Sequence, residues 1–180
     1  MEHPTIKLIS YGQFEAGLVS ELALNIRYEF NLNVSIEEQY LDLSDYYDPA
    51  RRQYDANKLL MEIDSLVAPV KTKTIGLFRV DLFIPILTYV FGQAFLKGNS
   101  GIASVYRLKN ELYGLPPDPQ LLKERFSKVV KHEIGHTFGL IHCHVPGCVM
   151  ISATYMEDID QKKDALCPKC RAEFYSLLND

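Results

Sequence analysis

Residues 132–142 read His132-Glu133-Ile134-Gly135-His136-Thr137-Phe138-Gly139-Leu140-Ile141-His142, which is the pattern H-E-x-x-H-x-x-G-x-x-H. Residues four apart on a helix lie on one face, so the rings of His132 and His136 can share one metal ion. Glu133 then lies beside that ion without binding it, where it can take a proton from a metal-bound water. Gly139 permits the left-handed backbone that ends the helix and returns His142 as a third ligand. Three neutral imidazoles and one open position are typical of a catalytic zinc, so the pattern predicts hydrolysis.

Length and composition indicate a single compact domain. The chain has 180 residues, of which 47% are hydrophobic and 23% are charged, as is usual for a globular protein with a sizeable core. The formal net charge of -4 offers no basic surface to nucleic acid or to an anionic membrane. We therefore expect neither partner, while the sequence does not fix the oligomeric state.

The ends of the chain and its apolar runs predict a cytoplasmic protein. Residues 1–4 lack the basic start and the apolar core of a signal peptide. The longest apolar run, residues 82–91, is interrupted by Pro85 and is too short to span a bilayer.

All four cysteines follow residue 142. Cys143 and Cys148 lie on either side of a short turn, and Cys167 and Cys170 form a C-x-x-C knuckle. Two disulfides or a redox pair are alternatives, but cytosolic proteins keep their thiols reduced. Paired thiolates on tight turns can close a tetrahedral site with no open position, so the spacing favours a structural zinc.

Hydrophobic periodicity predicts that strands and helices alternate before residue 81. The predicted strands cover residues 5–10, 34–40 and 72–80, the predicted helices cover 14–30 and 57–67, and residues 46–54 form a connection. This β-α-β order predicts a mostly parallel sheet with right-handed crossovers.

Two further strands are predicted at residues 89–96 and 102–108. The turn between them, residues 97–101, is too short for a parallel crossover, so the two strands should pair antiparallel. One strand must then oppose the others, and such a strand usually lies at the edge of a sheet.

The helix that carries the histidines has clear boundaries in the sequence. Asp118 is a candidate N-cap, Pro119 suits the first helical position, and Gly139 ends the helix. A closing helix is predicted at residues 171–178.

The expected fold is a mixed α/β (α+β) domain over residues 1–180, built from two lobes. Residues 1–139 form an upper lobe with the twisted sheet and the active-site helix. Residues 140–180 form a lower lobe that is too short for a core of its own. A zinc ion bound by the cysteines would stabilise this lower lobe by cross-linking it.

The histidine motif resembles that of the metzincin clan of zinc metallopeptidases, whose members carry a methionine turn beneath the zinc. The adjoining Cys143-x4-Cys148-x-Met150 and the later Cys167-x-x-Cys170 narrow the resemblance to the archaemetzincins. Sixteen residues separate Met150 from Cys167, which is about the spacing in that family. The predicted order of elements before the motif also looks like a metzincin upper lobe.

The resemblance implies a metzincin-like zincin fold with two zinc ions and a general base, Glu133. The catalytic zinc would be held by His132, His136 and His142. The structural zinc would be held by Cys143, Cys148, Cys167 and Cys170. Met150 falls where the methionine turn would be, with Met156 a weaker candidate, although an ordinary core methionine fits equally well.

Together these features predict a zinc-dependent metallopeptidase that hydrolyses peptide bonds through a zinc-bound water activated by Glu133. Its partner is then a peptide or protein substrate, which the sequence does not name. One alternative is a zinc hydrolase of a non-peptide amide. Another is a zinc-binding interaction module with a blocked active site, in which a protein group such as His144 fills the open metal position.

Overall fold

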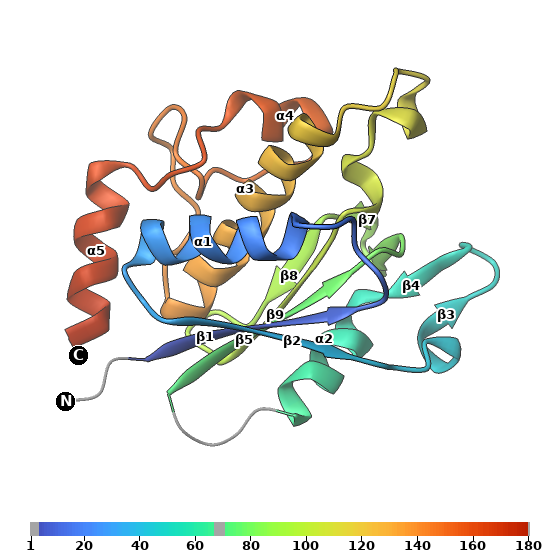
Figure 1. Ribbon diagram of the computed structural model, residues 1–180, viewed down its shortest axis with the longest axis horizontal. Coiled ribbons are helices and arrows are strands. Elements are labelled where there is room, and N and C mark those ends of the chain that lie inside the picture. The colour runs from blue at the N-terminus through green and yellow to red at the C-terminus, as the bar shows by residue number, and fades with distance from the viewer. Residues whose placement is uncertain (1–3, 67–70, 180) are drawn as a thin grey trace.

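The computed structural model describes residues 4–66 and 71–179, and Figure 1 shows its elements. The strands are β1 (Thr5–Tyr11), β2 (Val34–Gln39), β3 (Tyr47–Asp48), β4 (Gln53–Asp55), β5 (Thr72–Phe78), β6 (Leu82–Ile84), β7 (Leu87–Val90), β8 (Gly92–Ala94) and β9 (Ser100–Ser104). The α-helices are α1 (Leu18–Phe30), α2 (Ala56–Ser65), α3 (Pro119–Phe138), α4 (Met156–Gln161) and α5 (Pro168–Asn179).

A five-stranded sheet in the order β2-β1-β5-β9-β8 forms the centre of the molecule. The pairs β1–β2, β1–β5 and β5–β9 are parallel. Strand β8 pairs antiparallel with β9 and lies at the edge of the sheet. The mostly parallel sheet, the antiparallel last pair and its edge position are thus as predicted.

Helices cover both faces of this sheet, with α1 and α3 on one face and α2 on the other (Figure 1). Ile6 and Leu8 belong to the larger core under α1 and α3, and Ile9 and Tyr11 belong to the smaller core with α2. Successive residues of a strand point to opposite faces, so a central strand covered on both sides is apolar on both. This burial holds β1 rigidly in the middle of the sheet.

A second sheet, in the order β3-β4-β6-β7, corrects two of the predictions. Residues 46–54 contain β3 and most of β4, so their assignment as a connection is wrong. The predicted strand 89–96 is two strands, because β7 pairs in the second sheet and β8 in the first. The chain passes from one sheet to the other at Phe91, whose carbonyl accepts a hydrogen bond of 2.8 Å from the Ser104 N–H.

Other predicted elements are shorter in the structure. The helix predicted from residue 14 begins at Leu18, because Gly17 has a left-handed backbone with φ 82°. The strand predicted at 102–108 ends at Ser104, whose hydroxyl donates to the Val80 carbonyl at 2.6 Å and accepts from the Tyr106 N–H at 3.1 Å. These bonds turn the chain into a 3-10 helix. Residue 67, the predicted end of α2, lies outside the described residues.

The boundaries of α3 agree with the prediction. The Asp118 carboxylate accepts a hydrogen bond of 2.9 Å from the Leu121 N–H, and Pro119 is the first helical residue. Gly139 ends the helix with φ 104°. Cap, proline and glycine together fix which turn of α3 presents each histidine.

Buried basic side chains tie α3 to the chain that follows it. Arg125 meets both oxygens of Asp160 at 2.7 Å, and Lys131 meets Asp164 at 2.8 Å. Helix α4, which the sequence did not predict, lies in this segment, and α5 begins at Pro168, earlier than the predicted residue 171. Among the helices of residues 4–66 and 71–179, none combines the length and the apolar character needed to cross a membrane.

Candidate active site and metal centres

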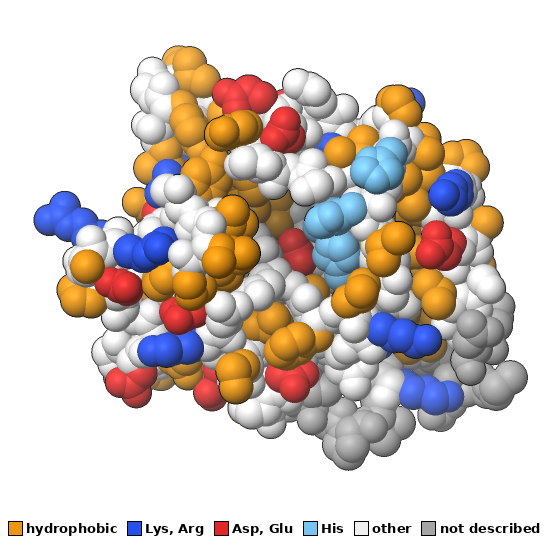
Figure 2. Space-filling view, turned by 180° about the vertical axis from the view of Figure 1, so that it is seen from behind, with side chains coloured by type: hydrophobic (Ala, Val, Ile, Leu, Met, Phe, Trp, Pro, Cys, Tyr) orange, Lys and Arg blue, Asp and Glu red, His pale blue; other side chains and the backbone are white. Residues whose placement is uncertain are grey.

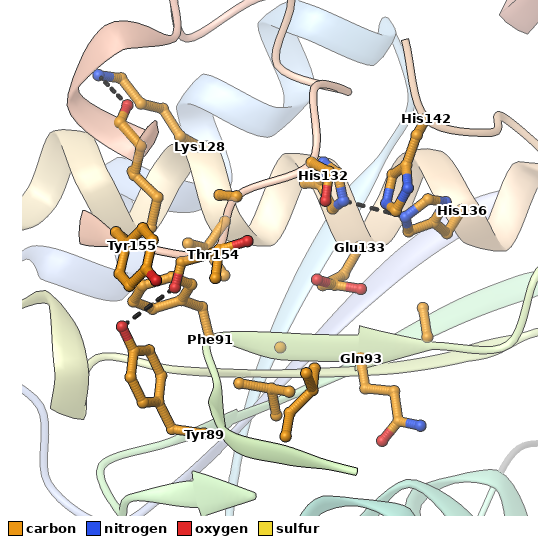
Figure 3. A pocket seen from close by; sticks show the side chains of 18 of the residues that line it. Tyr89, Phe91, Gln93, Lys128, His132, Glu133, His136, His142, Thr154 and Tyr155 are labelled. Atoms are coloured by element: carbon orange, nitrogen blue, oxygen red, sulfur yellow. Dashed lines mark hydrogen bonds between the residues drawn. The ribbon is translucent and has the colours of Figure 1, made fainter. Parts of the chain in front are cut away.

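Helix α3 and the turn after it bring the three predicted histidines together. His132 and His136 lie one turn apart on α3, and the left-handed Gly139 returns the chain so that His142 faces them. One ring nitrogen of each histidine lies within 4.8 Å of the other two. The Nε2 atoms of His132 and His136 are 3.0 Å apart, and Figure 3 shows the three rings converging.

Backbone carbonyls orient two of these rings. Nδ1 of His132 lies 2.9 Å from the Val149 carbonyl, and Nδ1 of His136 lies 2.8 Å from the Leu140 carbonyl. A carbonyl only accepts, so each Nδ1 carries the proton and each Nε2 keeps a free lone pair. Burial lowers the pKa of both histidines, which keeps the rings neutral and able to bind a metal.

Glu133 lies beside the three histidines, between α3 and β8 (Figure 3). Its side chain is buried, and burial raises its pKa to about 8 when no metal charge is nearby. Gly92 of β8 leaves room for this carboxylate, since a Cβ at Gly92 would lie 2.8 Å from its Oε1 and 2.6 Å from the Ile102 carbonyl. A bound cation would favour the charged carboxylate and lower that pKa.

Met150 is fully buried beneath α3. A Cβ added at Gly135 would overlap the Met150 sulfur, so the two residues are in direct contact. Gly135 lies on the turn of helix between His132 and His136. The methionine therefore packs directly against the metal-ligand turn of α3, whereas Met156 begins α4.

A cavity of about 440 Å³ extends from the histidines along α3. Its walls are β7, β8, one side of α3, residues 152–155 and the side chains of His142, Ile159 and Lys162. Figure 2 shows histidine side chains beside a hollow that contains an acidic side chain and has hydrophobic groups on its rim. Because the hollow reaches the histidines, the cleft is open. His144, the residue that could have blocked it, is exposed and outside the described cavity lining.

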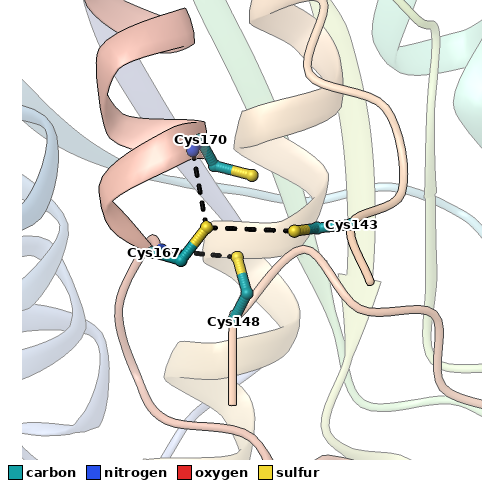
Figure 4. A group of neighbouring side chains, drawn as sticks. All are labelled: Cys143, Cys148, Cys167 and Cys170. Atoms are coloured by element: carbon teal, nitrogen blue, oxygen red, sulfur yellow. Dashed lines mark hydrogen bonds between the residues drawn. The ribbon is translucent and has the colours of Figure 1, made fainter. Parts of the chain in front are cut away.

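The four cysteines form a second cluster, in which all four sulfur atoms lie within 4.8 Å of one another (Figure 4). All are buried and free, and the Cys143 and Cys167 sulfurs are 3.9 Å apart, far beyond a disulfide bond of about 2.05 Å. The disulfide alternative is therefore wrong.

Backbone N–H groups favour the thiolate form in this cluster. The Cys167 N–H points at the Cys148 sulfur at 3.4 Å, and the Cys170 N–H points at the Cys167 sulfur at 3.5 Å. Burial opposes ionisation of Cys167, yet hydrogen bonds from Cys170 and from the neighbouring thiols bring its pKa down to about 7. One member of the cluster can therefore ionise near neutral pH.

Two buried lysines in the cavity wall, Lys128 and Lys162, were not predicted from the sequence. The Lys162 ammonium donates to the same Val149 carbonyl that holds His132, at 3.4 Å. No spacing rule or motif marks an isolated buried lysine. Tyr89 was also missed, although its hydroxyl joins two cavity walls by donating to the Thr154 carbonyl at 3.1 Å.

Comparison with known proteins points to one family. The model of peptidase family M54 matches residues 22–175. An archaemetzincin of Haloquadratum walsbyi is 32% identical over 174 residues, which cover 94% of this chain and 99% of that protein.

Two crystal structures share the fold over nearly the whole chain. A zinc-dependent peptidase of Methanocorpusculum labreanum has a TM-score of 0.85 and 31% identity, covering 94% of this chain and 99% of that one. An archaemetzincin of Methanopyrus kandleri has a TM-score of 0.85 and 30% identity, covering 99% of this chain and 97% of that one.

Proposed function

Because the chain belongs to peptidase family M54, the archaemetzincins, and is a zinc metallopeptidase, we propose a role for each residue that faces its cleft. His132, His136 and His142 hold the catalytic zinc, and Glu133 is the general base. The observation that carries the proposal is the convergence of three imidazole nitrogens at the edge of an open cavity.

The donor set of the three histidines fits zinc. The 3.0 Å between the two Nε2 atoms is close to the separation expected for two nitrogens about 2.0 Å from one tetrahedral ion. When bound, zinc supplies a Lewis acid that lowers the pKa of a water and polarises the carbonyl of the substrate. The Val149 and Leu140 carbonyls hold two of the rings in the orientation that this ion requires.

Glu133 transfers a proton from the attacking water to the leaving amine. Its carboxylate takes a proton from the water that attacks the peptide carbonyl, and it returns the proton to the amine that leaves. The buried position of Glu133 and the close approach of Gly92 fix the carboxylate next to the cleft. Burial raises the pKa of Glu133 and the charge of a bound cation lowers it, and the balance of the two sets how readily the carboxylate accepts and returns the proton.

Cys143, Cys148, Cys167 and Cys170 hold the structural zinc. Sulfurs about 2.3 Å from one tetrahedral ion are about 3.8 Å apart, and the distance between Cys143 and Cys167 is 3.9 Å. The cluster has four ligands from protein and so leaves no position for a substrate. This zinc joins the turn at residues 143–148 to the start of α5.

The substrate is a peptide or protein, and the site of action is the cytoplasm. The open cleft beside the edge strand β8 supports an extended peptide as the bound form. Four reduced, buried cysteines support a reducing compartment.

The function is tested by digesting an unbiased peptide library with the zinc-loaded protein, with and without a chelator. We expect chelator-sensitive cleavage that disappears in Glu133→Gln, while zinc content measured by mass spectrometry stays at the wild-type value. Retained turnover in Glu133→Gln would remove Glu133 from the mechanism. Absence of cleavage by the wild-type protein would contradict the peptidase assignment itself.

A further inference from the structure

Lys162 is a buried cation in the wall of the active-site cavity, and none of the described residues forms an ion pair with it. The residue is 7% exposed and lines the cavity. Its ammonium donates a single hydrogen bond, 3.4 Å long, to the Val149 carbonyl. Across residues 4–66 and 71–179, no carboxylate oxygen lies within 4.0 Å of this ammonium.

Two other buried cations, both on α3, are paired with carboxylates. Arg125 has Asp160, and Lys131 has Asp164, at 2.7 and 2.8 Å. Ammonium groups are rarely buried without such a partner, because desolvation of the charge is costly. Lys162 and Lys128 depart from this rule, since each ammonium has a backbone carbonyl as its partner and no carboxylate among the described residues.

Lys128, the other lysine of the cavity wall, has a different orientation. Its ammonium turns away from the histidines and donates to the Ile159 carbonyl at 3.2 Å (Figure 3). It thus adds positive charge near Lys162 without neutralising it.

The nearest acidic groups do not provide the missing partner. The Asp158 carboxylate already accepts hydrogen bonds of 2.8 Å from the Thr154 and Tyr155 N–H groups. Glu133 attracts the Lys162 ammonium electrostatically but forms no ion pair with it within 4.0 Å. Burial lowers the pKa of Lys162 to about 8, so the side chain remains mostly charged at neutral pH. A carboxylate that enters the cavity would find a cation with free donor capacity.

We propose that Lys162 binds a carboxylate of the substrate, so that the enzyme selects peptides with a carboxylate close to the bond it cleaves. The inference rests on the proposed function, because the cavity that Lys162 lines is the one that the histidines and Glu133 share. The group is either the side chain of Asp or Glu or the free C-terminus of a peptide. Both supply the same oxygen pair to the ammonium.

The proposal is tested by binding, independently of turnover. Zinc-loaded Glu133→Gln protein is titrated with acetylated and amidated alanine hexapeptides that carry one central Glu or one central Gln. A third peptide contains only alanine and ends in a free carboxylate, and a fourth is its amide. We expect one of the two carboxylate peptides to bind about 10- to 100-fold more tightly than its neutral partner. Which of the two does so identifies the source of the carboxylate.

The variant Lys162→Met should abolish this preference in the same Glu133→Gln background, because it keeps the apolar stem and removes the charge. Lys163→Met is the matched control, since it removes the same charge from an exposed neighbour outside the cavity lining and should keep the preference. A preference that survives in Lys162→Met would overturn the proposal. Equal weakening of all four peptides would also overturn it, because a merely structural lysine would have that effect.

The proposal stays testable even if Lys162→Met does not fold. Equal or undetectable binding of the four peptides to the Glu133→Gln protein, which retains Lys162, overturns the proposal by itself. Cleavage assays with wild-type enzyme separate the two hypotheses. Turnover of peptides without regard to their carboxylates keeps the peptidase function and refutes the role of Lys162. A binding preference without any turnover supports the role of Lys162 and contradicts the peptidase function.

Discussion

At the scale of single residues, the site depends on two glycines whose neighbours lie too close to admit a side chain. Gly92 and Gly135 each lie where a methyl group would meet a functional side chain, Glu133 in one case and Met150 in the other. The sequence motif includes Gly135 only as an unspecified position, and Gly92 lies outside it. Contacts of this kind arise from tertiary packing, so the motif alone could not predict them.

Gly92→Ala should lower kcat at least about 100-fold, because displacing the Glu133 carboxylate by even about 1 Å spoils its alignment. Zinc content should remain at the wild-type value, since the added methyl group would meet Glu133 and the Ile102 carbonyl and not a histidine. The measurement is steady-state kinetics together with metal analysis. In the Glu133→Gln background the same substitution should cause no further loss of activity, and an additional loss would show that Gly92 acts through another group.

The buried Glu133 also predicts a pH effect on the stability of the protein whose histidine site has been emptied by mild chelation. Its folded-state pKa is raised from 4.5 to about 8, so the folded state binds more protons than the unfolded state between these values. The wild-type free energy of unfolding should therefore fall progressively as the pH rises from about 5 to 8, because the buried carboxyl group loses the proton that stabilises the folded state. Glu133→Gln has no ionisable group at this position, so its free energy of unfolding should not fall for this reason. The difference between its free energy of unfolding and that of wild type, measured by urea denaturation, should therefore grow with pH. A constant difference between the two proteins would contradict the prediction.

At the scale of elements, hydrogen bonds and an ion pair connect α3 to α4 and to the chain before α3. Arg125 is nearly fully buried, and it binds both oxygens of Asp160, the Leu108 carbonyl and the Asn110 side chain. A single residue thus connects α3 to the chain before it and to the chain after it.

Arg125→Leu should reduce the free energy of unfolding by about 3 kcal/mol, because it leaves polar groups without their partner in a buried setting. Lys123→Leu is the control on the same helix, since its ion pair with Glu21 is partly exposed. That change should cost less than about 1 kcal/mol. Chemical denaturation of both variants gives the comparison, and equal losses would mean that burial of the Arg125 pair is unimportant.

Elements with local signals were predictable, and elements defined by distant partners were not. Asp118, Pro119 and Gly139 mark both ends of α3 in the sequence, and the structure has the same ends. The break between β7 and β8 depends on pairing with two different sheets, which no local pattern encodes. Helix α4 has only six residues and is held by Asp158 at its start, so it is too short to show a periodic stripe.

The same distinction applies to the site. The histidines and cysteines were predictable because metal geometry imposes fixed spacings along the chain. Lys162 was not, because its importance comes from what surrounds it in three dimensions.

At the scale of the whole molecule, the two metal centres are joined by residues 148–150. Cys148 belongs to the sulfur cluster, the Val149 carbonyl holds His132, and Met150 packs against Gly135. The division of the domain into lobes at residues 139 and 140 stays a prediction, and this segment provides a way to test it.

Cys167→Ser should lower the zinc content from two ions to one and should also weaken zinc binding at the histidines about 10- to 100-fold, because Val149 loses its support. Zinc competition titrations with a fluorescent chelator measure the remaining site. Lys169→Ser, an exposed change within the same knuckle, should alter neither value. An unchanged histidine site in Cys167→Ser would show that the lobes are independent units.

The shared segment has a consequence for a chain that lacks the thiolate-held ion. Because Cys148 and Val149 are consecutive, a chain without its thiolate-held ion should hold the carbonyl that aligns His132 less firmly. We therefore expect a chain without the thiolate-held ion to show little hydrolysis even when zinc is offered to its histidines.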